Sequence, residues 1–138
     1  MSLSPDSSAD PIQITLEQRV RYVECDPMGV AHHSVYVVWF EQARTELLRQ
    51  TGLAYAELER QGIFIVVARL NLSYHKPARY DDIVRIQARL IRSAGARIEH
   101  EYEVRRGDEL LCTGSSTLAC VDGEGRVLPV PEDLRREG

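Results

Sequence analysis

Residues 20–49, VRYVECDPMGVAHHSVYVVWFEQARTELLR, combine a strand pattern, a tight turn and the start of a long apolar helix. Alternating apolar and polar residues predict a strand over 14–23. The tetrapeptide DPMG at 26–29 predicts a turn, because aspartate bonds its own backbone, proline fixes φ and glycine tolerates positive φ. Ser34 is a candidate N-cap, and residues 35–40 are all apolar. We therefore expect a helix whose first turns are buried on every side.

The start of such a helix has a chemistry of its own. Its first backbone N–H groups have no acceptor within the helix, and the positive end of the helix dipole lies beside them. This place favours an anion, or an oxygen that becomes anionic during a reaction. Asp26 lies seven positions before His33, close to the expected helix start. The pattern predicts a site in which Asp26 is a nucleophile or a base.

Length and composition are those of one domain with a small-molecule partner. The chain has 138 residues, of which 43% are apolar, and this is enough to build a core. Residues 1–12 are rich in serine, aspartate and proline, so we expect a disordered lead before a single domain at 13–138. A formal net charge of −4 and a pI near 5.6 argue against a nucleic-acid partner.

The cysteines and the hydropathy of the sequence indicate the cellular compartment of the protein. Cys25, Cys112 and Cys120 are odd in number and show no C-x-x-C spacing, so a disulfide framework is not expected. The N-terminal residues have neither the basic nor the apolar region of a signal peptide. No run reaches the roughly 20 apolar residues of a membrane span. We therefore predict a cytoplasmic protein without a transmembrane segment.

The downstream pattern predicts a short helix at 54–61 and four strands at 63–75, 84–90, 97–105 and 110–121. The first of these strands begins with a continuous apolar run and is expected to be buried on both faces there. Short turns favour antiparallel pairing. We predict an α+β fold in which a bent antiparallel sheet wraps one long helix. Because one helix cannot cover both faces and edge strands remain, a homodimer or homotetramer is expected.

Two stretches resemble a known family: RVRYVECDPMGVAHHSVYVVWFEQARTELLR, which begins at Arg19, and VARLNLSYHKPARYDD at 67–82. Together with the strand order they cover about residues 19–121. They resemble the hotdog-fold acyl-CoA thioesterases of the 4-hydroxybenzoyl-CoA thioesterase class, in particular the YbgC-like subgroup associated with the Tol-Pal cell-envelope system. The resemblance implies a hotdog fold, with a curved sheet of about five strands around a central helix. It also implies hydrolysis of acyl-CoA thioesters without a cofactor, since coenzyme A is part of the substrate.

The resemblance assigns roles to particular residues. Asp26 would be the catalytic carboxylate, His33 would supply an oxyanion-hole N–H at the helix start, and Tyr22 would shape the site. The candidate substrate-binding residues are Gly29, Val30, His32, Tyr36 and Arg69. Val35 replaces a small polar residue, often asparagine, of the family pattern, and Ala96-Arg97 replaces residues that often carry hydroxyls.

Simpler interpretations exist for the same residues. Turn formation alone explains Asp26 before Pro27. His32 and His33 could ligate a metal with Cys25 and Asp26, but adjacent histidines rarely reach one ion and zinc spacings are absent, so no metal is expected.

Other functions and other roles stay open. A hotdog protein could bind acyl-CoA, or act as a scaffold, without turnover. A hotdog hydratase is less favoured, because its usual histidine five places after the aspartate is replaced by Ala31. Glu41 either approaches a substrate or pairs with Arg44. Five basic residues either contact coenzyme A phosphates or keep strand faces hydrated, namely Arg69, Lys76, Arg79, Arg92 and Arg97.

Overall fold

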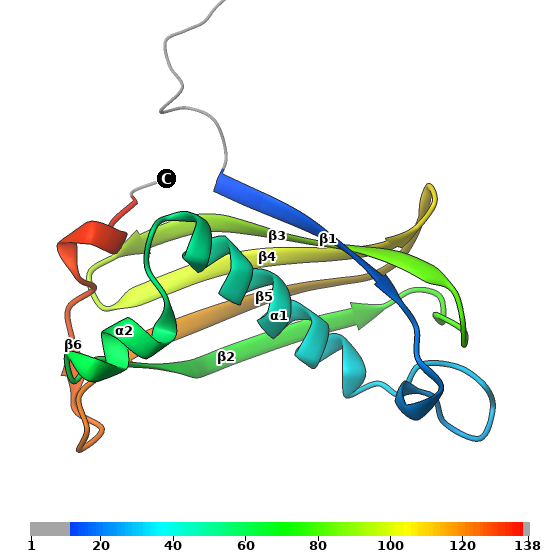
Figure 1. Ribbon diagram of the computed structural model, residues 1–138, viewed down its shortest axis with the longest axis horizontal. Coiled ribbons are helices and arrows are strands. Elements are labelled where there is room, and N and C mark those ends of the chain that lie inside the picture. Colours follow the sequence, from blue (N-terminus) through cyan, green and yellow to red (C-terminus); the bar gives the residue numbers. More distant parts are fainter. Residues whose placement is uncertain (1–11, 137–138) are drawn as a thin grey trace, which may run out of the picture.

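A long helix lies diagonally across one face of a curved antiparallel sheet in the computed structural model, which describes residues 12–136 (Figure 1). The elements are β1 (Ile12–Arg19), η2 (Tyr22–Glu24), α1 (Val35–Gln50), α2 (Tyr55–Arg60), β2 (Phe64–Tyr74), β3 (Ile83–Ala94), β4 (Arg97–Arg106), β5 (Glu109–Val121), β6 (Val127–Leu128) and η3 (Glu132–Leu134). The α+β hotdog architecture is thus confirmed. The expected disordered lead falls on residues outside the described range, except that its last residue, Ile12, begins β1.

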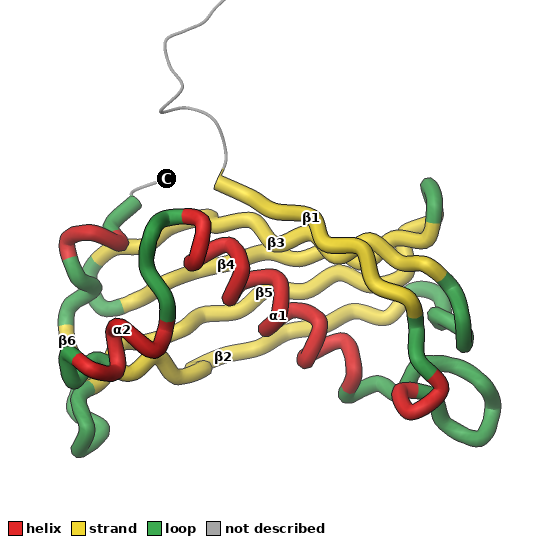
Figure 2. Tube along the Cα trace, in the orientation of Figure 1, coloured by secondary structure: helices red, strands yellow, loops and turns green. Residues whose placement is uncertain are grey.

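The sheet has the strand order β1-β3-β4-β5-β2, and the two-residue β6 adds a sixth strand beside β5 (Figure 2). Every pairing is antiparallel, as the short turns predicted. β2 does not pair with β3, although only residues 75–82 join them. Instead this connection crosses the end of the sheet, and β2 pairs with β5 at the far edge. The edges are therefore β1 and β2.

The main core lies between α1 and the sheet. Trp39, Phe40 and Ala43 are fully buried and lie on one face of the helix. They pack with apolar side chains of three strands, among them Val84, Ile86, Ala88, Tyr102, Val104 and Leu111. Each large side chain buried in this way contributes roughly 1.5–3 kcal/mol to folding. The expectation of a helix start buried on every side is wrong, because the sheet covers one side only and Val38 is 48% exposed.

Gly114 makes this close approach possible in the middle of β5. The Phe40 ring stacks on Tyr102 with 4.3 Å between ring centroids and an interplanar angle of 8°. A Cβ atom at position 114 would lie 2.5 Å from Cε2 of Phe40. The glycine is therefore required by the helix that packs on the strand.

Two strand predictions are corrected by the structure. The first strand ends at Arg19, and Tyr22 and Val23 lie in a 3-10 turn with 79% and 78% of their surface exposed. The start of β2 is not buried on both faces, since Val66 and Val67 are 43% and 49% exposed. The physical reason is that β2 is an edge strand with β5 as its partner.

A second apolar cluster lies at the opposite end of the sheet from the 25–31 loop, beneath α2 and the C-terminal segment (Figure 1). It includes Leu58 of α2, Leu118 of β5 and Leu134 of η3. Within residues 12–136, no helix is long and apolar enough to cross a membrane.

The Gly114 contact predicts a stability effect. Gly114→Ala should lower the free energy of unfolding by about 1–3 kcal/mol, because the added methyl overpacks against Phe40. Urea unfolding measures the change. Gly123→Ala is the matched control, since its new Cβ would meet only Cε2 of Phe64 at an ordinary 3.8 Å, and it should stay within about 0.5 kcal/mol of the parent. Equal stability of the two variants would contradict the account.

Candidate active site

The turn predicted at 26–29 forms a closed loop just before α1. An isolated bridge between Cys25 and Ala31 closes it. The Asp26 N–H donates to the Val30 carbonyl at 2.9 Å, and the Gly29 N–H donates to the Asp26 carbonyl at 2.9 Å. Gly29 has φ +79°, a conformation that side chains disfavour. The sequence therefore predicted this turn correctly.

Only one of the two Asp26 carboxylate oxygens accepts hydrogen bonds from the turn. Its Oδ1 accepts from the Met28 N–H at 2.8 Å and from the Val30 N–H at 3.4 Å. Among the described residues, nothing donates a hydrogen bond to its other oxygen. Turn formation and a chemical role are thus compatible, because one oxygen fixes the orientation and the other stays available.

Asp26 lines an open groove of about 360 Å³ at the start of α1. The groove is formed by the 25–31 loop, the helix start and the end of β2 with the residues that follow. Its lining residues are Asp26, Ala31, His33, Tyr36, Tyr74, His75, Lys76 and Pro77. Three of the predicted site residues therefore meet there: Asp26, His33 and Tyr36.

Within the described residues, the helix start offers one free N–H donor in this groove, that of His33. No acceptor for the His33 N–H is found in the described part of the chain. Ser34 is the N-cap residue, as predicted, but its side chain makes no capping bond. Its Oγ instead lies 2.8 Å from Nδ1 of His32. The Ser34 N–H donates to Nδ1 of His32 at 3.2 Å, so the His33 N–H is the donor left open beside the positive end of α1, where a developing negative charge is favoured.

Two tyrosines form the wall opposite the turn. The Tyr74 hydroxyl donates to the His33 carbonyl at 2.9 Å, and the Tyr36 hydroxyl accepts from the Ala78 N–H at 3.2 Å. The rings of Tyr36 and Tyr74 pack edge to face with centroids 5.2 Å apart. Burial raises the pKa of both phenols. Both hydroxyls are therefore protonated at neutral pH. That of Tyr74 donates to His33, and that of Tyr36 keeps a hydrogen that it can donate.

Tyr22 and Gly29, also predicted for the site, lie on the outside of the loop. The exposed Tyr22 ring packs edge-on against Tyr80, with centroids 5.6 Å apart. The Gly29 carbonyl accepts from the Tyr80 N–H at 3.1 Å. These residues shape the loop and do not line the groove.

The remaining predicted residues also lie outside the groove lining. Val30 forms an isolated bridge with Arg79, and the His32 ring lies over that of His33 with centroids 4.1 Å apart. Arg69 is an exposed residue of β2, paired in register with Thr117. Val30 and His32 thus support the loop, whereas Arg69 lies farther along the edge strand.

Of the basic candidates, only Lys76 lines the groove. Its Nζ pairs with Oε2 of Glu109 at 2.9 Å. Arg69, Arg79, Arg92 and Arg97 form no ion pair within residues 12–136. Glu41 and Arg44 form the helix ion pair that their spacing predicted, with 3.8 Å between Oε2 and Nη2.

Glu24 is a supporting residue that the sequence interpretation missed. Its carboxylate is buried and accepts from the Arg21 N–H at 2.8 Å and from Nε1 of Trp39 at 3.1 Å. Its carbonyl accepts from the His32 N–H at 2.8 Å. Glu24 therefore joins the loop to the core face of α1. The available signal was the glutamate three places after Arg21, a capping-box spacing that ends the strand.

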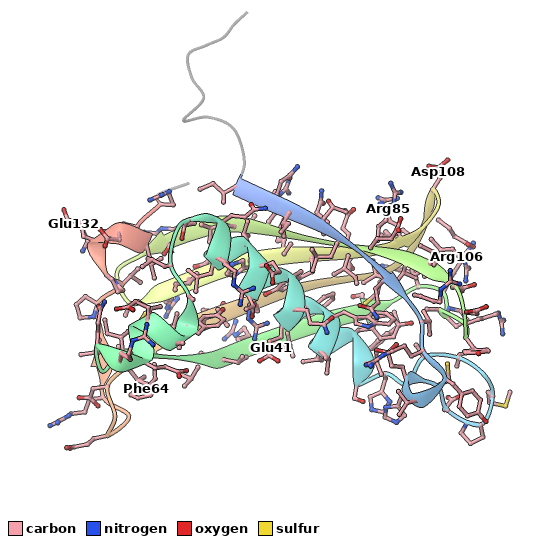
Figure 3. All side chains as sticks on the ribbon, in the orientation of Figure 1. Glu41, Phe64, Arg85, Arg106, Asp108 and Glu132 are labelled. Atoms are coloured by element: carbon pink, nitrogen blue, oxygen red, sulfur yellow. The ribbon has the colours of Figure 1, made fainter. Side chains whose placement is uncertain are left out.

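Arg106 fixes the far side of the groove from β4. Its Nη1 donates to Oδ2 of Asp82 at 2.6 Å and to the Pro77 carbonyl at 3.2 Å, while its Nη2 bonds to Glu109 at 2.6 Å. Arg106 lies at the end of the sheet, where Arg85 and Asp108 are also found (Figure 3). Arg106 thus holds the segment that follows β2 against the end of the sheet, and Pro77 of this segment lines the groove.

Comparison with known proteins decides the family. The model of the Thioesterase-like superfamily matches residues 20–137. The chain belongs to that superfamily. An acyl-CoA thioesterase YbgC from Haemophilus influenzae is 32% identical over 119 residues, which cover 85% of this chain and 88% of the relative. An acyl-CoA thioester hydrolase YbgC from Escherichia coli O6:H1 is 31% identical over 105 residues, which cover 75% and 78%.

A solved structure of another thioesterase is also similar to this chain. The DHNA-CoA thioesterase from Staphylococcus aureus superposes with a TM-score of 0.81 at 33% sequence identity, covering 85% of this chain and 80% of that one. The thioesterase class and the YbgC-like subgroup inferred from the sequence are therefore confirmed. A link of this thioesterase-family chain to the Tol-Pal system stays a prediction.

Glu24 of this thioesterase-family chain can be tested by substitution. Glu24→Gln should lower the free energy of unfolding by about 1–3 kcal/mol, because one amide oxygen cannot replace both carboxylate oxygens toward Arg21 and Trp39. Glu59→Gln, an exposed change on α2, is the control and should leave stability nearly unchanged. Thermal or urea unfolding measures both. A Glu24 variant as stable as the control would remove this residue from the support of the loop.

Proposed function

We propose that the chain hydrolyses acyl-CoA thioesters to the free acid and coenzyme A in the groove at the start of α1. The observation that carries this proposal is the half-used Asp26 carboxylate beside a helix start whose His33 N–H has no acceptor in the described residues. The names of both YbgC relatives, acyl-CoA thioesterase and acyl-CoA thioester hydrolase, support the same chemistry.

The proposed reaction needs few groups. A thioester carbonyl is electrophilic, and its thiolate leaves without strong acid help. Asp26 takes a proton from water as the water oxygen attacks the carbonyl carbon, and the oxyanion forms at the His33 N–H. The C–S bond then breaks, and the thiolate of coenzyme A leaves and is protonated. Alternatively, the Asp26 oxygen attacks directly and water hydrolyses the resulting anhydride. Neither route requires a metal or a cofactor.

Neighbouring residues fit a hydrolase. The protonated Tyr36 hydroxyl lines the groove and can donate to the bound acyl group. Ala31 also lines the groove and has no polar atom with which to replace the histidine that the resemblance assigns to hotdog hydratases. The hydrolase is therefore favoured over the hydratase on the residues present.

The alternative without turnover is a binding or scaffold protein that keeps the same groove. A continuous assay of thiol release across short-chain, long-chain and aromatic acyl-CoAs separates the two functions. Release with any member of the panel supports the enzyme, whereas saturable binding with no release supports the binding protein. A cytoplasmic location is part of the same proposal, since coenzyme A esters are made and used there.

Asp26 and His33 give the sharpest test of the mechanism. Asp26→Asn keeps the shape of the side chain but removes the charge, so turnover should fall by ~10² or more while acyl-CoA binding survives. His33→Ala keeps the backbone N–H and should cost far less. Thiol release measures turnover, and equilibrium binding measures affinity.

Thermal melts are the control for both variants, which must stay folded for the comparison to count. An Asp26→Asn protein with near wild-type turnover would leave Asp26 as a turn-former only. A loss in His33→Ala as large as that in Asp26→Asn would give the imidazole a role in orienting water or substrate.

We also propose that the chain is at least a dimer. β2 is an open edge with Val66 and Val67 on its surface, and Val38 of α1 is exposed as well. Pairing of this edge with a second copy would satisfy its backbone groups and bury these side chains. Light scattering at micromolar concentration should give a mass of two or four chains. A monomer would contradict the proposal. Val67→Lys places a charge on this edge strand and should therefore shift the assembly toward monomer.

A further inference from the structure

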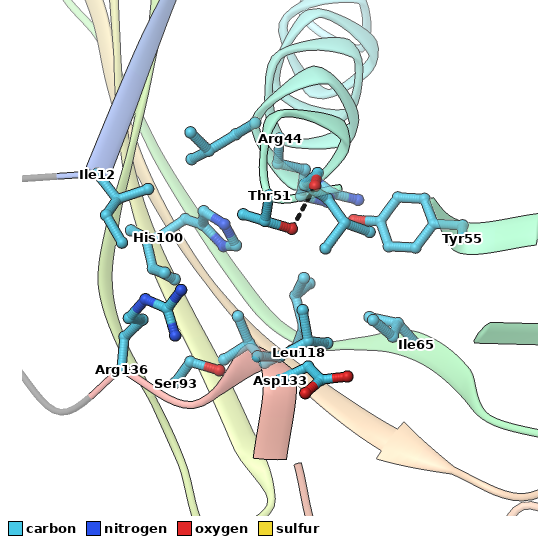
Figure 4. A pocket seen from close by; sticks show the side chains of 15 residues that line it. Ile12, Arg44, Thr51, Tyr55, Ile65, Ser93, His100, Leu118, Asp133 and Arg136 are labelled. Atoms are coloured by element: carbon cyan, nitrogen blue, oxygen red, sulfur yellow. Dashed lines mark hydrogen bonds between the residues drawn. The ribbon is translucent and has the colours of Figure 1, made fainter. Parts of the chain in front are cut away.

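A partly open, mostly apolar cavity of about 40 Å³ lies at the other end of α1 from the groove (Figure 4). Arg44 follows Val35 by nine positions, so it lies about 14 Å farther along the helix axis. The apolar part of the wall is made by Ile12, Leu47, Leu48, Ile65, Leu90, Ile98, Leu118 and Leu134. The cavity therefore lies between α1, the sheet and η3, in a part of the molecule that the proposed reaction does not use.

Three polar side chains enter this apolar space from different elements. Arg44 comes from α1, Ser93 from β3 and His100 from β4, and they are 7%, 1% and 7% exposed (Figure 4). Within residues 12–136, the Ser93 Oγ and the His100 Nδ1 have no hydrogen-bond partner. Buried polar atoms are normally satisfied, and each that is not costs roughly 1–3 kcal/mol. Their convergence on one cavity points to a ligand.

Arg44 is a buried cation with weak compensation. Its ion pair is with Glu41, at 3.8 Å, and the Glu41 side chain is 64% exposed. Burial raises the pKa of the nearby Tyr55, while the charge of the Arg44 guanidinium and a hydrogen bond with it act in the opposite direction. The phenol stays neutral, so it is a polar neighbour of Arg44 and no counter-ion. A buried guanidinium without a close carboxylate favours an anion in the cavity beside it.

Ser93 and His100 are suited to complete such a site. The Ser93 backbone is fixed by two hydrogen bonds with Arg136, at 2.6 and 2.7 Å, so the position of its hydroxyl does not depend on the cavity. Burial, and next the charge of Arg44, lower the pKa of His100 to about 4. The imidazole is therefore neutral at pH 7, and one ring nitrogen carries a hydrogen that it can donate.

We propose that this cavity binds a short-chain monocarboxylate, whose carboxylate lies at Arg44, Ser93 and His100 and whose alkyl chain lies against the leucines of the wall. One water needs roughly 10–15 Å³ on the same scale, so the cavity has room for about three such volumes, enough for a carboxylate and the carbon next to it. The remaining carbons of a short chain would extend toward the open rim at Asp133 and Arg136. A phosphate would find no second buried cation, and a hydrocarbon would leave the polar atoms unsatisfied. The exposed Asp133 and Arg136 at the rim carry opposite charges and roughly cancel.

Calorimetric titration of the full chain with sodium butyrate tests the proposal. We expect saturable binding of one butyrate per chain, and binding of butyramide at least ~10-fold weaker, since the amide has the same shape without the charge. Ser93→Ala should weaken butyrate binding by roughly 3–10-fold, and Arg44→Met by at least ~10-fold. Arg49→Met, on the exposed side of the same helix, is the matched control and should bind as the parent does.

Asp26→Asn distinguishes this cavity from the groove, because butyrate is also a conceivable product there. Unchanged butyrate affinity in that variant supports the cavity, and this holds whether or not the chain hydrolyses thioesters. The absence of saturable binding, equal binding of butyrate and butyramide, or loss of binding in Asp26→Asn but not in Ser93→Ala would each overturn the proposal. Should Arg44→Met fail to fold, the butyramide comparison and Ser93→Ala still decide.

Discussion

The packing of one face of α1 on the concave side of the sheet is the contact on which the other features depend. Trp39 and Phe40 are buried by the strands, and this fixes both the height and the direction of the helix. The position of its first turn follows. The 25–31 loop then has to meet the helix start, and the hydrogen bond from Trp39 to Glu24 ties the loop to the same buried face. A core interaction thereby determines where the N–H groups of the helix start are placed.

The site illustrates how a local backbone role leaves one side chain free for the chemical role proposed for it. Asp26 holds the turn with one oxygen, and this removes rotational freedom that would otherwise oppose the proposed reaction. The carbonyl of His33 is held by Tyr74, so the residue that carries the proposed N–H donor is anchored at its following peptide. Preorganised dipoles of this kind need little rearrangement as charge develops. The loop, the helix start and the edge strand are all needed for this arrangement.

Sequence patterns predicted the elements well because alternation and apolar runs report directly on burial. They failed where burial depends on a partner strand or on a single side chain. Val66 and Val67 read as fully buried, but the strand order that makes β2 an edge is not encoded in its own residues. Tyr22 continued the alternation of the first strand, although Glu24 ends that strand by capping a 3-10 turn.

The sequence predicted the groove residues that lie near the turn and missed those that come from distant segments. Asp26 and His33 are close in sequence to the turn that brings them together, so spacing was informative. Tyr74 and Pro77 reach the groove from a segment some forty residues later, and only the tertiary fold brings them there. The convergence of Arg44, Ser93 and His100 is likewise invisible in the chain order, since three separate elements supply one residue each.

The fit of Phe40 over Gly114 has a consequence for how sequences of this family drift. The two positions share one volume, although 73 residues lie between them in the sequence. A side chain at position 114 overpacks the contact as long as Phe40 is present. A smaller residue at position 40 leaves a void beside Tyr102 as long as Gly114 is present. The pair should therefore vary together among relatives, as a marker of how closely the helix lies on the sheet.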